Sequence, residues 1–434
     1  MKRLMVVYGT RPEAIKMAPV IEALHRSPHF EPTVTVTAQH RELLDQVHSL
    51  FGIRPDHDLD ILRKHQTLSD ITVRVLNGLC PLLRSERPDA VLVQGDTTTV
   101  FAGALAAFYH RIPIVHLEAG LRTDDRYAPF PEEINRRLAT QLATLHLAPT
   151  PHARDNLIRD GVAPSSVVVT GNTVIDALHW AVERKAHYED LALADLDDTA
   201  RRVLLVTAHR RESWGSGMES VGGALADLAR AEPELLIVFP LHPNPVVRAA
   251  ILPQVERIEN VRLTEPLAYG AFARLMNRSH LILTDSGGLQ EEGPGLGKPV
   301  LVMRDTTERP EAVQAGTSRL VGTDRDHIVK QVRELLHDRE AYASMARAIN
   351  PFGDGRAAER VVRAIGHWMG LCGRPDEFGS ASAPEPAGVE NGLAAQHAPL
   401  DAPEGVVVDE QHDDVRVAHG GGDVDEFDPA RTRQ

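Results

Sequence analysis

Three acidic residues in the first half of the chain stand where proton-transfer groups are often found. Asp96 follows the apolar run at 90–93, Glu118 follows the run at 112–117, and Glu132 opens a predicted helix. Each has an ordinary alternative, as a helix cap, a loop carboxylate or an acid at a helix N-terminus. Together at one sheet edge, they could supply a proton acceptor and a proton donor on opposite faces of a substrate. A metal site is disfavoured, because no histidine or aspartate stands at metal-ligand spacing nearby.

Basic residues follow the first apolar run of the chain, at 4–8. Pro12 suits the first position of a helix. Arg11 and Lys16 would then face an anion such as a diphosphate at the N-terminus of that helix. A strand–helix turn with solvated charges explains this segment equally well. In the second half, His209 follows the run at 203–207 beside two arginines, and an anion site is favoured there over a capped loop histidine.

The segment 284–292, TDSGGLQEE, carries the most specific local pattern. A hydroxyl and two glycines open a helix directly after a strand, so backbone N–H groups can approach a phosphate closely. Glu291 or Glu292, one turn further on, could accept hydrogen bonds from ribose hydroxyls. The alternative is a glycine-opened turn without a ligand. The polar turn at 304–311 could close on the same ligand, or form a surface loop, and the proline-flanked turn at 241–245 is interpreted as structural.

Neither of two common nucleotide-binding patterns occurs. No GxGxxG fingerprint follows a predicted strand, because 293–297 has the wrong spacing and contains a proline, and there is no P-loop. A bound nicotinamide is therefore not expected.

Ten short apolar runs alternate with amphipathic segments, which favours parallel strands buried on both faces and flanked by helices. The runs fall into two sets of five, and the sequence therefore predicts an α/β fold with two doubly wound domains. The first set is 4–8, 33–37, 90–93, 112–117 and 167–170; the second is 203–207, 235–239, 261–263, 281–284 and 299–303.

The domain boundary is placed near 171–180. Residues 1–171 would form the first domain and residues 172–355 the second. The helical segment 356–371 has no strand of its own and is expected to pack back on the first domain. Residues 372–434 hold fourteen acidic and four basic residues and are poor in aromatics, so we expect a disordered acidic tail that carries most of the net charge of −14.

Composition excludes several protein classes. Hydrophobic residues make up 42% of the chain and charged residues 25%, as in ordinary globular proteins. The two cysteines, Cys80 and Cys372, form no CxxC pair, which argues against disulfides or structural zinc and favours the cytoplasm. No apolar stretch is long enough to cross a membrane. Clustered basic residues for nucleic acid are missing.

At these motifs the sequence resembles the bacterial non-hydrolysing UDP-N-acetylglucosamine 2-epimerases, in register from about Lys2 to about His367. The tail has no recognised counterpart. The matching motifs are GTRPEAIKMAP (9–19), TAQHRELLDQV (37–47), QGDTTT (94–99), HLEAGLRT (116–123), PEEINR (131–136), GNTVIDAL (171–178), HRRES (209–213), DSGGLQEE (285–292) and RDTTERPEA (304–312).

The resemblance implies two Rossmann-like domains facing a cleft, as in GT-B glycosyltransferases, and a homodimer. Leu267 stands where some members have a polar residue, so no uridine contact is carried over to it. The implied catalytic residues are Asp96, Glu118, Glu132 and His209. The implied substrate-binding residues are Arg11, Lys16, Phe272, Ser286, Gly287, Gly288, Glu292 and Arg309.

The implied reaction inverts C2 of UDP-N-acetylglucosamine to give UDP-N-acetylmannosamine, a precursor of cell-surface polysaccharides. The C2 hydrogen is not α to a carbonyl, so it is removed after transient oxidation or with elimination of UDP. The family uses elimination, which agrees with the missing nicotinamide fingerprint and requires no cofactor. The alternatives are an epimerase for a related UDP-diacetamido sugar, a GT-B glycosyltransferase and a non-catalytic nucleotide-sugar sensor.

Some members bind a second substrate molecule as an activator. The residues that match this second site are Gln39, Arg210, Glu212 and His242. Glu42 and His65 depart from it, since those members have glutamine and arginine there. Each departure removes a hydrogen-bonding or charged partner for a diphosphate.

Overall fold

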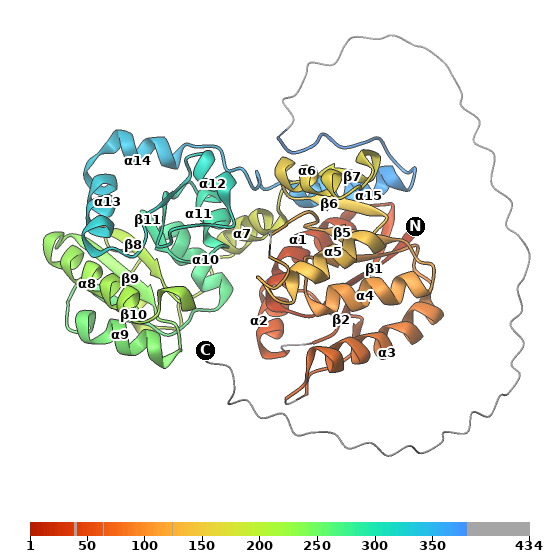
Figure 1. Cartoon of the computed structure of the whole chain (residues 1–434), viewed down its shortest axis with the longest axis horizontal. Helices are drawn as coiled ribbons and strands as arrows, with labels where there is room; N and C mark the ends of the chain where they lie inside the picture. Colours follow the sequence, from red (N-terminus) through yellow and green to blue (C-terminus); the bar gives the residue numbers. More distant parts are fainter. Residues whose placement is uncertain (39–40, 64, 124, 380–434) are drawn as a thin grey trace, which may run out of the picture. The chain divides into compact units, whose positions relative to one another are not determined.

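The computed structural model describes residues 1–38, 41–63, 65–123 and 125–379; the side chains of 41–43 are also outside the description. Of the expected acidic tail, residues 380–434 therefore lie outside the described residues. Figure 1 follows the described chain through two parallel sheets, the first drawn in red to yellow and the second in green to light blue.

The first sheet has seven parallel strands in the order β3-β2-β1-β4-β5-β6-β7. Alternate residues of β1 enter two different cores, because successive side chains of a strand point to opposite faces. Leu4, Val6 and Tyr8 pack on one face, and Met5 and Val7 on the other. The strands are β1 (Lys2–Tyr8), β2 (Phe30–Val36), β3 (His57–Asp58), β4 (Ala90–Gln94), β5 (Ile114–Leu117), β6 (Leu145–Ala148) and β7 (Val167–Val169).

Helices cover both faces of this sheet. One face packs against α1 (Arg11–Arg26), α2 (Arg41–Phe51), α7 (Thr173–Glu183) and α15 (Ala357–Trp368). The other packs against α3 (Leu68–Glu86) and α4 (Thr98–Tyr109), with α5 (Glu132–Leu142) contributing Ala139. Helix α6 (Pro151–Arg159) packs beside β6 and β7.

The second sheet has six parallel strands in the order β10-β9-β8-β11-β12-β13. They are β8 (Arg202–Thr207), β9 (Leu235–Pro240), β10 (Val261–Thr264), β11 (Leu281–Thr284), β12 (Val300–Val302) and β13 (Ser318–Leu320). One face carries α8 (Ser216–Ala231), α9 (Pro245–Val255), α13 (Arg325–His337) and α14 (Arg339–Ala346). The other carries α7, α10 (Tyr269–Arg278) and α11 (Leu289–Gly295); the short helix α12 (Pro310–Gln314) precedes β13.

Both sheets reverse their strand order at one point, between β1 and β4 in the first and between β8 and β11 in the second. The loops that leave the carboxyl ends of these strand pairs diverge and open a crevice where ligands bind. The fold is thus the predicted pair of doubly wound, Rossmann-like sheets. All ten predicted strands are present.

The expected start of the disordered tail at 372 is too early. The backbone N–H of Phe378 donates to the carbonyl of Val169 (2.9 Å), and Arg374 donates to the carbonyl of Val167 (3.1 Å), so this segment runs along the otherwise open edge of β7. Phe378 packs on the cluster formed by α6 and β7, with Arg360 above its ring at 5.6 Å. The segment before residue 380 therefore has a defined position, because Phe378 packs on an apolar cluster and the backbone pairs with the edge of β7.

Helix α15, which follows the second sheet in sequence, packs on α1, α7 and β6. Val361, Ala364 and Ile365 are buried in the core of the first sheet. In the part of the chain that the structure describes, no helix combines the length and the apolar character that a membrane span requires.

Candidate active site

A cavity of about 810 Å³ is lined by residues that follow β1, β8 and β11, at the reversal points of both sheets. It brings together residues far apart in the sequence and from both halves of the chain. Nine predicted site residues line it: Arg11, Lys16, His209, His242, Phe272, Ser286, Gly288, Glu292 and Arg309. Leu267 lines it too. Gly287 is not among its lining residues but lies beside the Arg210 guanidinium.

The carboxylate of Asp285 organises the second-sheet side of this cavity. It is buried at the end of β11 and accepts hydrogen bonds from the backbone N–H groups of His209 (2.6 Å) and Arg210 (2.7 Å). Its other oxygen lies 2.8 Å from His209 Nδ1. Burial raises the pKa of the Asp285 carboxyl, but its bonds to His209 and the backbone outweigh burial, and the net pKa lies below its ordinary value. An ionised Asp285 therefore fixes the β8 loop and the orientation of the His209 ring.

Glu292 lines the same cavity beside Tyr269. Its carboxyl accepts a hydrogen bond from the Tyr269 hydroxyl at 3.0 Å. Burial, reinforced by the charge of Glu291, raises the pKa of Glu292 to about 7, and the bond from Tyr269 offsets only part of this. Near neutral pH this group can both donate and accept hydrogen bonds, as a ribose diol requires.

Glu118 lies beside the cation expected to bind the diphosphate. Lys16 Nζ is 2.6 Å from both carboxylate oxygens, and the Gln94 amide donates to one of them. Burial raises the pKa of the Glu118 carboxyl, but the Lys16 ammonium reverses that shift and leaves the pKa below its ordinary value. Glu118 also has a left-handed backbone, with φ of 61°. Such strain in a residue other than glycine is concentrated at functional sites.

Asp96 and Glu132 approach Glu118 from the neighbouring loop and from the start of α5. Asp96 pairs with Arg136 at 2.7 Å. Burial raises the pKa of Asp96; Arg136 counteracts the shift, whereas the Glu118 and Glu132 charges add to it. One oxygen of Glu132 is buried and has no hydrogen-bond partner among the described residues. Glu118 and Glu132 therefore both lie within electrostatic reach of Asp96.

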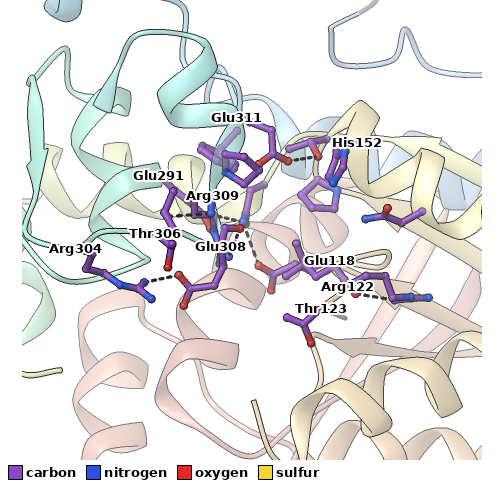
Figure 2. Close-up of a pocket in the computed structure, with 18 residues that line it drawn as sticks. Glu118, Arg122, Thr123, His152, Glu291, Arg304, Thr306, Glu308, Arg309 and Glu311 are labelled. Atoms are coloured by element: carbon purple, nitrogen blue, oxygen red, sulfur yellow. Dashed lines mark hydrogen bonds and ion pairs between the residues drawn. The ribbon is translucent and has the colours of Figure 1, made fainter. Parts of the chain in front are cut away.

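A second cavity, of about 320 Å³, adjoins the first and shares two lining residues, Glu291 and Arg309. Figure 2 shows it, with Glu118, Glu291 and Arg309 turned toward one region. Arg309 is paired with Glu291, and this ion pair belongs to the walls of both cavities. Glu118 lines the second cavity, whereas Asp96 and Glu132 line neither.

Two of the expected substrate-binding residues, Lys16 and Arg309, are paired with carboxylates, which favour their charged forms. Burial lowers the pKa of Lys16, but the charges of Glu118 and Glu291 raise it by more than burial lowers it. The net pKa of Lys16 therefore lies above its ordinary value. The pKa of Arg309 is likewise lowered by burial and raised more strongly by Glu291. A diphosphate that enters here would take over cations that are already fixed and ionised.

The residues expected to bind a second, activating substrate molecule do not all line one cavity. Arg210 Nη2 lies 3.2 Å from Glu308, and Glu212 lies 2.6 Å from Arg304 Nε, so both are paired with the polar turn at 304–311. His242 lines the large cavity and stacks on His209, with ring centroids 5.9 Å apart. Gln39 and the side chain of Glu42 lie outside the described residues.

Three residues of this site were not singled out from the sequence. Asp285 stands first after β11, inside a motif that was already recognised. Asn172 caps α7 inside the motif at 171–178 and donates to Glu118 and Glu291. Glu13 forms a capping box with Thr10 and joins the β1–α1 turn to Thr97. The Thr-x-x-Glu spacing of a capping box would have identified Glu13.

No cluster of three or more metal-ligating side chains occurs within the described ranges. The described residues offer the groups for proton transfer beside an anion site: carboxyls whose pKa values are shifted in opposite directions, an imidazole held by Asp285, and half-buried cations.

The comparisons with known proteins agree on one family. A protein-family model described as UDP-N-acetylglucosamine 2-epimerase matches residues 22–366. The UDP-N-acetylglucosamine 2-epimerases of Yersinia pestis and Escherichia coli K12 are each 54% identical to this chain, over 84% of it and 98% of each relative.

Two solved structures are similar to the chain. The UDP-GlcNAc 2-epimerase of Neisseria meningitidis, bound to UDP-GlcNAc, is 48% identical over 84% of this chain and 99% of its own, with a TM-score of 0.75. S. aureus MnaA, solved with UDP, is 46% identical over 87% and 100%, with a TM-score of 0.76. As the sequence resemblance predicted, the chain belongs to the UDP-N-acetylglucosamine 2-epimerase family.

Proposed function

We propose that this chain interconverts UDP-N-acetylglucosamine and UDP-N-acetylmannosamine by elimination and re-addition of UDP. One observation carries the proposal. The cations suited to a departing diphosphate, Lys16 and Arg309, share one buried group with Glu118, a carboxylate suited to proton transfer. Binding alone would not require ionised carboxylates beside the anion site. The activities of the relatives support the same reaction.

In the proposed reaction, a carboxylate removes the C2 proton and the C2–H electron pair becomes the C1–C2 double bond. The C1–O bond breaks, and its electron pair leaves with UDP. A second carboxyl then protonates C2 from the opposite face, and the β-phosphate oxygen adds back to C1. Asp96, Glu118 and Glu132 are the candidate acids and bases. Lys16, Arg309 and His209 would stabilise the charge that develops on the diphosphate.

UDP binding is assigned mainly to the second sheet. Backbone N–H groups at the start of α11, around Ser286, Gly287 and Gly288, would contact the phosphates, together with Arg11 from the first half. Glu292 would bind the ribose. Phe272 contributes an apolar surface for the base.

Proton NMR of the purified chain with UDP-N-acetylglucosamine in heavy water tests the proposal. We expect UDP-N-acetylmannosamine to appear, with deuterium at C2 and without net release of UDP. Activity should need no added NAD or metal and survive EDTA. Exchange limited to a UDP-diacetamido sugar would indicate the related epimerase, and stoichiometric UDP release a transferase or a hydrolysing enzyme. Binding without any exchange would indicate a nucleotide-sugar sensor.

We also propose a cytoplasmic homodimer. Both cysteines are free, which suits a reducing compartment. Phe108 and Tyr109 on α4 and Leu138 on the adjacent α5 are exposed large apolar side chains. Light scattering should give twice the monomer mass. Charged substitutions at Phe108 and Tyr109 should lower the measured mass toward that of a single monomer.

We propose that a second substrate molecule could activate the chain only if its binding breaks ion pairs that the structure already contains. A second diphosphate would have to displace Glu308 from Arg210 and Arg304 from Glu212. Initial rates from UDP-N-acetylmannosamine alone decide the point. A lag that added UDP-N-acetylglucosamine removes would support activation, and full activity without it would reject an obligatory activator.

A further inference from the structure

A buried row of charges joins the two halves of the active site through one neutral side chain. Lys16 contacts Glu118, and Arg309 contacts Glu291. Between the two carboxylates lies Asn172, whose Nδ2 donates to Glu118 Oε1 (3.2 Å) and to Glu291 Oε2 (2.7 Å). All three acceptor and donor side chains are buried. One amide nitrogen thus serves a carboxylate of each half.

The position of Asn172 is fixed by contacts that use the rest of the residue. Its Oδ1 accepts the backbone N–H of Val174 (3.1 Å) and so caps α7, and its own backbone N–H donates to the carbonyl of Phe352 (2.6 Å). Helix α7 enters both cores, since Ala177 packs in the first sheet's core and Leu178 in the second's. The amide nitrogen is therefore held on a rigid element common to both halves.

We propose that Asn172 is a positioning residue for proton transfer, which holds Glu118 and Glu291 side by side while Lys16 and Arg309 turn to the substrate's diphosphate. The inference deepens the proposed epimerase function and rests on it. A diphosphate competes with the carboxylates for both cations. Once the cations turn away, two buried like charges would face each other. A neutral amide donor stabilises both in place without neutralising either.

Removal of the amide should make Glu118 easier to protonate. Like charges that share a buried site disfavour ionisation of both, and a lost hydrogen bond to the charged form acts in the same direction. The charged and titratable groups that face Glu118 are Lys16 on α1, Asp96 after β4, His116 on β5, and Glu291 and Arg309 from the second half. Replacing Asn172 leaves the chemical identity of each of these groups unchanged.

The test compares Asn172→Ser with the unaltered chain. Serine keeps an N-cap acceptor for α7 and removes both N–H donors of the amide. We expect kcat to fall about tenfold and the limb of the pH profile that Glu118 controls to move up by roughly one pH unit. In the direction where Glu118 is the base, this is the acidic limb. In the reverse direction, where Glu118 must be protonated, it is the alkaline limb, and the shift has the same sign.

Two further variants separate positioning from packing. Asn260 is also buried, and its amide donates to the carbonyls of Ala229 (2.9 Å) and Leu235 (3.0 Å), far from any charge of the site. Asn260→Ser should lower the melting temperature but leave both limbs in place. Adding Glu291→Gln to Asn172→Ser removes the facing charge and should move the limb back toward its original pH.

If Asn172→Ser melts as Asn260→Ser does and keeps both limbs and kcat of the unaltered chain, Asn172 is only a cap and the inference is wrong. If Asn172→Ser does not fold, Asn172→Asp preserves shape and cap and adds a third carboxylate. A limb raised above that of the unaltered chain then supports the inference, and an unmoved limb contradicts it. Absence of conversion by the unaltered chain would instead reject the proposed function.

Discussion

The carboxyls of Glu118, which is buried, and Asp96, which is half-buried, lie in opposite electrostatic environments. Lys16 holds the pKa of Glu118 below its ordinary value, whereas burial holds that of Asp96 above it despite Arg136. Pairs of carboxyls whose environments separate their pKa values are how one site provides both an acid and a base. In the substrate-free chain, Glu118 is therefore the group held more readily in the ionised form that a base requires, and Asp96 the group held more readily in the protonated form that an acid requires.

Near-isosteric replacement of these two carboxyls should slow proton transfer more than binding. For Glu118→Gln and Asp96→Asn we expect kcat to fall about 10²–10⁴-fold. KM should stay near its original value, because the nucleotide-binding residues of the second sheet are untouched. C2–deuterium exchange, followed by NMR in heavy water, should fall with kcat.

Asp89→Asn is the matched control. Asp89 precedes β4, the strand that Asp96 follows, and so lies at the opposite end of that strand. It is paired with Lys2 (2.9 Å) and the backbone N–H of Arg3 (2.8 Å). It should change the melting temperature slightly and kcat not at all. If the Glu118 and Asp96 variants bound UDP weakly yet exchanged at the normal rate, both residues would be reassigned to binding.

Glu292 should make the stability of the chain depend on pH in an unusual direction. Its folded-state pKa, about 7, lies above the ordinary 4.5, so the folded state binds the proton more tightly than the unfolded state. Stability from this group is complete below about pH 4.5 and is lost as pH rises through 7. Glu292→Gln, which still accepts from Tyr269, removes this loss.

We therefore expect Glu292→Gln to melt like the unaltered chain at pH 5 and to be more stable at pH 8, by on the order of 2 kcal/mol. Calorimetry at the two pH values measures this difference. UDP affinity should fall, because the ribose ligand is altered. A pH-independent difference in melting temperature would show that Glu292 is ionised in the folded state throughout.

The sequence could predict nine of the residues that line the larger cavity, because strand ends and glycine-opened turns mark them. It could not predict their partners. Asp285 and Arg136 act through contacts formed only when separate loops meet, at separations of 76 and 40 residues along the chain. For the same reason, the sequence did not indicate that Lys16 is paired with Glu118 before substrate arrives.

At the level of secondary-structure elements, hydrophobic runs identified strands wherever the run was continuous. Strand β6 was missed because His146 interrupts its four residues, and its buried ring is accommodated by the carbonyl of Thr140 at 3.1 Å. β3 and β13 were missed because two or three residues carry no pattern. Tertiary pairing, rather than local preference, makes these segments strands.

The turn between β1 and α1 depends on Glu13. This buried carboxylate accepts the backbone N–H groups of Gly9 (3.0 Å) and Thr10 (2.7 Å) and the hydroxyl of Thr97 (2.6 Å). It ties the loop that carries Arg11 to the loop that carries Asp96. Glu13→Gln cannot satisfy both sets of donors and should cost about 1–3 kcal/mol of stability.

We also expect Glu13→Gln to raise KM, since the Arg11 loop is no longer held. Thermal melting and steady-state kinetics measure the two effects. Glu22→Gln on the same helix is the control, because Glu22 forms an exposed pair with Arg26, and such pairs contribute little. Equal effects of the two substitutions would show that the turn holds its shape without Glu13.

Across the whole molecule, the chemistry is divided between the sheets. The first carries the three carboxyls proposed for proton transfer, the second carries the turn proposed to bind the nucleotide, and residues that follow β1, β8 and β11 line one cavity. Helix α7 contributes to both cores. This division explains why a carboxylate variant should spare UDP binding.

A chain truncated after Gly379 should keep its melting temperature and turnover, because none of the site residues lies beyond it. Truncation after Leu371 should keep turnover but melt about 2–4 °C lower, since it removes Phe378 from the α6–β7 cluster and uncovers the edge of β7. Full-length Phe378→Ala should reproduce part of that loss. A large fall in kcat for the chain ending at Gly379, with unchanged melting, would instead show that residues 380–434 take part in catalysis.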